Sequence, residues 1–261
     1  MNKREVTIYK IGGGIIDDAV ALTKFLELLA QVAGPKILVH GGGKGASTMM
    51  RKLGLEPRLI NGRRITDAAT LDIVTMCYAG KTNKQVVADL QRLGVNALGL
   101  SGADGNVIQG IKRPVKDIDY GFVGDLTPAS VNKQLLQSLL AANIMPVLCP
   151  IIHDGQGQLL NTNADTIASA VAVALAAENE VTLHYCFEKN GVLRNVADDN
   201  SVIPQINSTT YAELKAQGII SDGMLPKLEN AFSALKQGVA KVIIGHALNI
   251  RSDLHTVLCL N

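Results

Sequence analysis

Apolar runs alternate with glycine-rich turns and helical patterns along the first part of the chain. Residues 6–11 form a β-rich apolar run that ends at Gly12-Gly13-Gly14, and a helical pattern follows. A second apolar run, residues 36–39, ends at His40 and Gly41-Gly42-Gly43, and a second helix is expected after it. This repeated order of strand, loop and helix predicts a right-handed parallel arrangement of strands.

The same alternation continues to the end of the chain. It predicts helices at residues 67–79, 83–93, 130–142, 208–217 and 224–237, and an apolar helix that ends at residue 177. It predicts strands at residues 95–100, 144–152, 181–185 and 241–244, and a β-hairpin excursion within residues 105–127. We therefore expect an α/β protein with two lobes, residues 1–177 and 178–261, and a hinge near the end of the apolar helix.

Composition narrows the function classes. The net charge of +2 over 261 residues is too close to neutral to indicate binding to nucleic acid or to an anionic membrane surface. Hydrophobic residues make up 47% of the chain and aromatic residues 3%, so the core must be largely aliphatic, which suits parallel strands beneath helices. The longest apolar run, residues 167–177, is shorter than the roughly 20 residues that a membrane-spanning helix needs.

Cysteine and histidine positions give a further expectation. Cys77, Cys149, Cys186 and Cys259 lie in apolar stretches without a C-x-x-C pair, which is typical of free thiols in a reducing compartment. Because no secretory signal pattern is present at the start, we expect a cytoplasmic protein. The histidines lack the spacing of metal ligands, so no metal site is expected.

The two glycine loops indicate phosphate chemistry. Glycine lets backbone N–H groups converge on an anion, and a helix N-terminus adds its dipole. A P-loop is excluded because Lys44 is followed by Gly45 rather than by Ser or Thr. A dinucleotide fingerprint is formally present, but the acidic residues that should follow it, Glu56 and Asp67, are poorly placed. An oxidoreductase is therefore the runner-up, and a kinase without either motif is favoured.

Three further clusters carry candidate chemistry. The segment from Asn161 to Asp165 holds three Asn or Asp residues, more than one helix cap requires. Arg63 and Arg64 follow a Gly turn, either as part of a solvated loop or as a clamp for a carboxylate. Lys227 falls in the first turn of an expected helix, where the dipole disfavours a cation, which suggests an anionic partner.

Together these motifs resemble those of the amino acid kinase family, and within it those of the acetylglutamate kinases. The resemblance extends over nearly the whole chain, from Lys10 to the last expected strand. Its most specific motifs are Val39-His40-Gly41-Gly42-Gly43, Asn61-Gly62-x-Arg64-x-Thr66, Asn161-x-Asn163-Ala164-Asp165 and Asp222-Gly223-Met224-x-x-Lys227. The family implies a three-layer α/β/α sandwich around an open, mainly parallel sheet. It also implies acyl-glutamate binding and dimerisation in the N-terminal lobe and ATP binding in the C-terminal lobe.

The resemblance also implies a reaction. ATP would phosphorylate the side-chain carboxylate of N-acetyl-L-glutamate, or a close N-acyl-glutamate, to an acyl phosphate, the second step of arginine biosynthesis. A carboxylate nucleophile has a reference pKa of about 4.3 and is already ionised at pH 7, so no general base is required. Alignment and charge neutralisation remain as the tasks of the protein. Mg²⁺ would arrive with ATP, bound mainly through phosphates and waters.

Residue roles carry over motif by motif. The resemblance implies catalytic roles for Lys10, Asp165 and Lys227, with Asp165 orienting both lysines. It implies phosphate binding at Gly12 and Gly13, and substrate binding at Gly42, Gly43, Arg64, Asn161 and Asn163, where Arg64 holds the α-carboxylate. It implies nucleotide binding at Glu188, Gly191, Val192, Leu193, Ile219, Ile220 and Ser221.

One departure and several alternatives accompany this interpretation. Glu188 stands where the family commonly has Asp, which adds one methylene to a nucleotide-binding side chain. Carbamate, uridylate and aspartate kinases, or a non-catalytic sensor of the same fold, remain alternatives, and the identity of the N-acyl group, acetyl or succinyl, stays open. Only nine residues precede Lys10. From this we expect a homodimer that arginine does not inhibit, with its interface near the helix at residues 67–79.

Overall fold

A single eight-stranded sheet forms the centre of the protein. The computed structural model describes residues 3–60, 62–220 and 224–261. The strands, in their order across the sheet, are β12 (Gln205–Ile206), β14 (His255–Leu258), β13 (Lys241–His246), β11 (Asn179–Phe187), β1 (Arg4–Ile11), β2 (Lys36–His40), β8 (Met145–Leu148) and β5 (Ala97–Leu100). Neighbouring strands run parallel except for the antiparallel pair β13 and β14. The expected mainly parallel sheet is confirmed.

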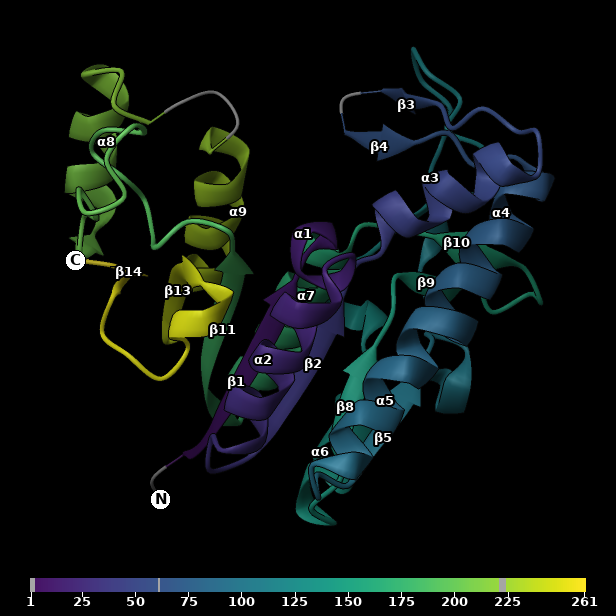
Figure 1. Ribbon diagram of the computed structural model, residues 1–261, viewed down its shortest axis with the longest axis horizontal. Helices are drawn as coiled ribbons and strands as arrows, with labels where there is room; N and C mark the ends of the chain where they lie inside the picture. The colour runs from purple at the N-terminus through teal and green to yellow at the C-terminus, as the bar shows by residue number, and fades with distance from the viewer. Residues whose placement is uncertain (1–2, 61, 221–223) are drawn as a thin grey trace.

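Helices cover both faces of this sheet (Figure 1). The aliphatic side chains on one face pack against α2 (Ala19–Ala30) and α5 (Asn83–Arg92). Those on the other face pack against α6 (Lys133–Ala141), α7 (Ala164–Ala176) and α9 (Leu225–Lys236), and α8 (Ser208–Ala216) adds Leu214 to the same cluster. The three-layer α/β/α arrangement is therefore also confirmed.

Smaller elements surround the carboxyl ends of the strands. Two short helices follow β1 and β2, namely α1 (Gly13–Ile16) and α3 (Gly43–Lys52), and α4 (Ala68–Thr75) packs on α3. Three hairpins are formed by β3 (Leu59–Ile60) with β4 (Arg63–Arg64), β6 (Ile111–Lys112) with β7 (Gly124–Asp125), and β9 (Ile151–His153) with β10 (Leu159–Asn161). Single 3₁₀ turns are η2 (Asp104–Asn106), η3 (Pro128–Ser130) and η4 (Ala247–Asn249). In Figure 1 the β3–β4 hairpin, α3 and α4 lie at one end of the molecule, and α8 lies at the other.

Strand alternation decides which side chains reach the site. Successive side chains of a strand point to opposite faces, so Val6, Ile8 and Lys10 share the face of β1 that α7 covers. In the parallel pair with β11, Lys10 lies opposite Tyr185, and Phe187 follows two residues later on the same face. The apolar pattern of β1 therefore ends with an amine at the carboxyl edge of the sheet.

Two expected elements differ from the structure, and some strands were not expected. The helix expected at residues 67–79 is α4 followed by a π-helix, η1 (Met76–Thr82), that continues into α5. The strand expected at residues 144–152 is divided into β8 and β9, with Cys149 and Pro150 between them. The pattern also missed β14, whose alternating exposure marks it as a strand nearer the sheet edge.

No helix in the described part of the chain is both long enough and apolar enough to cross a membrane.

Candidate active site

The two glycine loops meet at the carboxyl ends of β1 and β2. The Gly41 N–H donates to the carbonyl of Ile11 at 3.0 Å, which joins the second loop to the end of β1. Gly42 has a φ of 153°, and a Cβ atom there would lie 3.0 Å from the Tyr78 ring, so only glycine fits. The first amides of α1 and α3 have no acceptor within their own helices, and neither helix has a side-chain cap, so these ends suit an anion.

A cavity of about 210 Å³ lies beside these loops. Glycine backbone, two charged clusters and a few apolar side chains form its wall. The lining residues are Lys10, Gly12, Gly13, Gly41, Gly42, Gly43, Leu59, Gly62, Arg63, Arg64, Tyr78, Val123, Pro150, Asn161, Thr162, Asn163, Ala164 and Asp165. A polar molecule with negative charge fits this lining, because cations and free amides outnumber the single carboxylate.

Lys10 and Asp165 form an ion pair at the cavity. The Lys10 Nζ lies 2.6 Å from the Asp165 Oδ1 atom, and the Lys10 side chain is only 9% exposed. Asp165 lies in the first turn of α7, where a carboxylate also interacts favourably with the helix dipole. Asn163 is the N-cap of that helix, and its Oδ1 accepts the Asp165 N–H at 2.7 Å. The cap therefore fixes the helix end that presents Asp165 to Lys10.

Lys227, in α9, lies near the same aromatic ring as Lys10, that of Phe187. Its Nζ lies 4.2 Å from the centre of the Phe187 ring, and Lys10 Nζ lies 5.8 Å from the same centre. Burial lowers the pKa of Lys227, and the charge of Lys10 lowers it further, whereas Asp165 and Glu188 raise it. The Asp222-Gly223 part of the motif that contains Lys227 lies outside the described residues.

Arg64 supplies a buried cation at the cavity wall. It lies on β4, and its Nη2 donates to the Gly43 carbonyl and to the Ser47 hydroxyl, both at 2.8 Å. Its Nη1 lies 3.2 Å from the Met50 sulfur. Within the described residues Arg64 makes no ion pair. A buried charge without a counter-ion is costly, so this position favours an anionic ligand.

Asn161 connects β10 to the Arg64 strand. Its Nδ2 donates to the Thr66 hydroxyl at 3.0 Å, and that hydroxyl donates to the Arg64 carbonyl at 3.0 Å. Asn161 is buried, and its backbone N–H donates to the Phe122 carbonyl at 2.9 Å. These bonds hold the amide group in one orientation at the cavity.

A buried network of hydrogen bonds holds the second glycine loop, residues 41–43, to α5 and β8. His40 is fully buried, and burial lowers its pKa to about 4, so the ring is neutral at pH 7. Its Nδ1 lies 2.7 Å from the Gly41 carbonyl, which requires the Nδ1–H tautomer and leaves Nε2 to accept from the Asn83 amide at 3.1 Å. Asn83 also donates to the Val147 carbonyl at 2.9 Å. The end of the π-helix is thus connected to the loop that lines the cavity.

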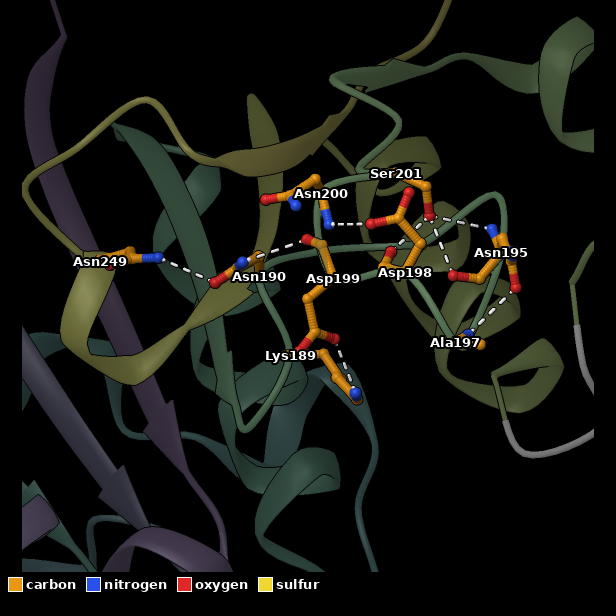
Figure 2. Close-up of polar contacts among 9 residues, drawn as sticks. All are labelled: Lys189, Asn190, Asn195, Ala197, Asp198, Asp199, Asn200, Ser201 and Asn249. Carbon is orange, nitrogen blue, oxygen red and sulfur yellow. Dashed lines mark hydrogen bonds and ion pairs between the residues drawn. The ribbon is translucent and has the colours of Figure 1, made fainter.

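The segment after β11 is held mainly by its own polar groups. Figure 2 shows Lys189 directed toward Asp199, with their charged atoms 2.7 Å apart, and Asn190 bonded to the Asp199 carbonyl. The Asn249 amide donates to Asn190 at 3.0 Å, which attaches the segment to η4. The Ser201 hydroxyl closes the far end of the loop through several short bonds. These bonds fix the shape of the loop.

Gly191 and Val192 pack against β14 rather than against the cavity. A Cβ atom at Gly191 would lie 2.6 Å from the Thr256 hydroxyl, which also accepts the Val192 N–H at 2.9 Å. The side chains of Val192, Leu193 and Ile220 are buried. These contacts explain the residue types structurally, and their contact with a nucleotide stays a prediction. Ser221 lies outside the described residues.

Glu188 reaches back to the first glycine loop. A Cβ atom at Gly14 would lie 1.6 Å from the Glu188 Oε1 atom, so the carboxylate occupies the space directly beside the Gly14 backbone. The charge of Glu188 also opposes the lowering of the Lys227 pKa that burial causes.

Comparison with known proteins places this arrangement in a family. The model of the amino acid kinase family matches residues 5–246. The chain belongs to the amino acid kinase family.

Individual relatives of this amino acid kinase agree along almost the full length. An acetylglutamate kinase of Phocaeicola vulgatus is 53% identical over 98% of this chain and 99% of the relative. An acetylglutamate kinase of Bacteroides fragilis is 52% identical over 96% of this chain and 95% of the relative. The crystal structure of smu.665 from Streptococcus mutans has a TM-score of 0.76 at 28% identity, covering 97% of this chain and 98% of that one.

The structure of this amino acid kinase brings most of the predicted site residues together. The predicted phosphate-binding and substrate-binding residues all line the cavity, as do Lys10 and Asp165. Lys227 lies next to them through the Phe187 ring. The described nucleotide residues, Glu188, Gly191, Val192, Leu193, Ile219 and Ile220, do not line that cavity.

Sequence reasoning missed two side chains near the reacting groups. Asn83 is the first residue of α5 and is only 1% exposed. A buried side-chain amide needs hydrogen-bond partners, but only the fold shows that His40 is one of them. Phe187 is one of nine aromatic residues in the chain, and its position beside Glu188 was the available signal. Its contact with two lysines from distant elements depends on tertiary structure.

Proposed function

We propose that this chain is an acetylglutamate kinase, which transfers the γ-phosphoryl group of ATP to the side-chain carboxylate of N-acetyl-L-glutamate in arginine biosynthesis. The buried guanidinium of Arg64 carries the proposal. It lies on the cavity that Lys10 and the glycine loops also line, and it makes no ion pair within the described residues. A substrate with a free α-carboxylate supplies the missing counter-charge, and its second carboxylate then faces Lys10.

The chemistry matches the side chains available. One oxygen of the ionised side-chain carboxylate attacks the γ-phosphorus, the bond to the oxygen between the β- and γ-phosphorus atoms breaks, and ADP leaves with that electron pair. No proton has to be removed from the nucleophile, which agrees with a site built from lysines, an arginine and backbone amides. The protein contributes alignment and positive charge.

Each charged group has a proposed part in this transfer. Lys10 contacts the oxygens of the transferring phosphoryl group, and Lys227 stabilises the charge that develops on the ATP side. Asp165 holds Lys10 through the 2.6 Å ion pair and attracts Lys227 at longer range. The amides of the two glycine loops bind phosphoryl and substrate oxygens, while Arg64 and Asn161 hold the acyl-glutamate. MgATP is the donor, with Mg²⁺ bound through the phosphates and waters.

The two lobes receive different substrates in this proposal. Every residue that lines the cavity belongs to residues 1–177, which supports acyl-glutamate binding there. ATP would bind over residues 178–261, near Glu188, the 191–193 segment and residues 219–221. Lys227 and Phe187 belong to that second part and face Lys10 from it.

The test is a hydroxamate assay for an acyl phosphate. The purified chain is incubated with MgATP and one of N-acetylglutamate, N-succinylglutamate, glutamate, aspartate or UMP, and ADP is measured in parallel. We expect hydroxamate with an N-acyl-glutamate and little with the free amino acids. ADP formation with UMP and no hydroxamate would instead identify a nucleotide kinase. No turnover with any acceptor would contradict the proposal and support a non-catalytic binding protein.

We also propose a cytoplasmic homodimer. All four cysteines are free, which agrees with a reducing compartment. Met76, in the region of residues 67–79 where we place the interface, is 59% exposed in the isolated chain. Light scattering on the purified protein should give twice the 27.6 kDa chain mass. Substituting Met76 by Asp should then shift the mass toward the monomer, whereas a monomeric wild-type protein would exclude the homodimer.

A further inference from the structure

The two lysines of the site are held by different kinds of partner. Lys10 has a carboxylate partner, Asp165, at 2.6 Å. Lys227 makes no ion pair among the residues that the structure describes. The contact that its ammonium group makes is with the face of Phe187, whose centre is 4.2 Å away. The position of Lys227 at the site therefore depends on an aromatic ring.

Phe187 is itself held by the sheet. It is the last residue of β11 and is paired in register with His246 of β13. Its ring stacks on the Tyr185 ring, with centres 6.1 Å apart and an angle of 17° between the planes. Tyr185 is buried in the core, so the stack gives the Phe187 ring a fixed base. The ring is half-buried, and partial removal of water strengthens its attraction for a cation.

A ring suits this position better than a carboxylate would. Lys10 and Lys227 both lie within about 6 Å of the ring centre, the range over which the negative face of an aromatic ring attracts a cation. The ring can therefore attract two like-charged groups at once. It does so without a formal negative charge, which would repel the oxygens of a phosphoryl group that binds between the lysines.

We propose that Phe187 is a positioning residue for phosphoryl transfer. Before the substrates bind, its ring holds the Lys227 ammonium group in place and also attracts the ammonium group of Lys10. The proposal rests on the proposed kinase function, since it concerns where Lys227 stands when ATP arrives. Phe187 acts through Lys227 and does not itself need to touch a substrate.

The first test compares Phe187→Leu with Phe187→Tyr. Leucine keeps the apolar packing and removes the ring, whereas tyrosine keeps the ring. We expect Phe187→Leu to lower kcat by about tenfold, the size of a partly desolvated cation–π contact, with a smaller change in the KM for acyl-glutamate. Phe187→Tyr should retain most of the activity. Equal losses in both variants, or no loss in Phe187→Leu, would overturn the proposal.

The pH profile separates positioning from packing. The charged groups that face Lys227 are Asp165 and Glu188, which favour its protonated form, and Lys10, which opposes it. The ring face also favours the protonated form, so removing it should lower the pKa of Lys227. The alkaline limb of the kcat profile should then begin at lower pH in Phe187→Leu than in the wild type. An unchanged limb would mean that Phe187 only fills space.

The matched control is Tyr211→Leu in α8. The Lys215 ammonium lies 5.9 Å from the Tyr211 ring, so this variant also removes a ring beneath a lysine in the same lobe. It should reduce thermal stability and leave the alkaline limb where it is in the wild type. If it shifts the limb as much as Phe187→Leu does, the shift reflects general loosening of the lobe, and the proposal is wrong.

A second measurement does not depend on activity. Lysines are dimethylated with ¹³C-formaldehyde, and the Lys227 signal is identified by its loss in Lys227→Arg. We expect an upfield ring-current shift of this signal in the wild type and in Phe187→Tyr. In Phe187→Leu the signal should remain, but without the upfield shift. If the wild type forms no acyl phosphate, the kinase function fails while this measurement still decides the contact. A Lys227 signal that is the same in all three proteins would refute the contact itself.

Discussion

The Nζ atom of Lys10 lies 2.6 Å from the Oδ1 atom of Asp165, at the junction of the central strand β1 and the first turn of α7. The lysine comes from the glycine-loop motif and the aspartate from a motif 155 residues later in the chain. Parallel strands and a capped helix bring them together. The ion pair is therefore held in place by the fold, and such preorganisation is the condition for electrostatic catalysis.

Lys10→Ala and Lys227→Ala should each lower kcat by about 100- to 1,000-fold, because each removes a preplaced cation from developing charge. The hydroxamate assay under saturating substrates measures this loss, and circular dichroism confirms that the fold is retained. Lys215→Ala is the matched control, since Lys215 makes an exposed ion pair with Glu229 at 3.1 Å. Wild-type turnover in both site variants would remove the catalytic assignment.

Arg64→Ala should raise the KM for acyl-glutamate far more than the KM for ATP. Removing one partner of a buried charge pair costs about 2–5 kcal/mol, which corresponds to a roughly 30- to 5,000-fold weaker interaction. Arg63→Ala is the comparison: Arg63 also lines the cavity from β4 but holds the variable position of the motif, so its loss should raise this KM less. A similar rise in both KM values for Arg64→Ala would show that the guanidinium is not specific for the carboxylate substrate.

Glu188 and Gly14 should behave as a coupled pair. Gly14→Ala alone places a methyl group in the space of the exposed Glu188 carboxylate, which must then move aside, and should weaken ATP binding with little loss of stability. Glu188→Ala alone should raise the KM for ATP and leave that for acyl-glutamate unchanged. The double variant should lose less ATP-binding free energy than the two single variants lose together, as measured by a double-mutant cycle on ATP affinity. Simple additivity would indicate that the Glu188 side chain points elsewhere.

Stability should fall as the pH is lowered below about 6.5, because of two buried histidines. Burial lowers the pKa of His40 to about 4 and that of His184 to about 3. Below pH 6.5 the unfolded chain binds protons at these positions and the folded chain does not, so acidification favours unfolding. Each histidine contributes up to about 1.4 kcal/mol per pH unit. This stability is fully present above that pH.

Urea unfolding at pH 7.5, 6.5 and 5.5 measures this dependence. His184→Phe should show a shallower decline of the unfolding free energy than the wild type, because one of the two protonation sites is absent from the unfolded chain. The difference between the two slopes isolates His184 from all other titrating groups. Parallel slopes would contradict a neutral, buried His184.

The sequence was sufficient for those parts of the fold that depend on local pattern. The apolar runs before each glycine loop predicted β1 and β2, and the Asn163–Asp165 cluster predicted the start of α7. The π-helix was not predictable, because the helical pattern runs on from α4 through residues 76–79 and does not show the change in hydrogen-bond spacing. The boundaries of the elements also moved by a few residues where caps and turns compete.

In the candidate site, too, some residues could be predicted from local sequence motifs and others only from the tertiary structure. Lys10, Arg64 and Asp165 were predicted from motifs, since each motif has a fixed order of residues along the chain. Phe187 was not predicted, because its significance comes from two lysines that lie 177 residues before it and 40 residues after it. A contact of that kind is a property of strand order and helix packing, which no local pattern contains.

The central place of β1 has a consequence for local unfolding. This strand is paired along its whole length with β11 and from Thr7 to Ile11 with β2, so its amides should be among the slowest to exchange with deuterium. Arg64, in contrast, lies on a hairpin whose two strands have two residues each. The proposed acyl-glutamate site is therefore made by one of the most protected strands and one of the least protected hairpins of the protein. Substrate binding should slow exchange at Arg63 and Arg64 far more than at Tyr9 and Lys10, which makes the hairpin the sensitive reporter of occupancy.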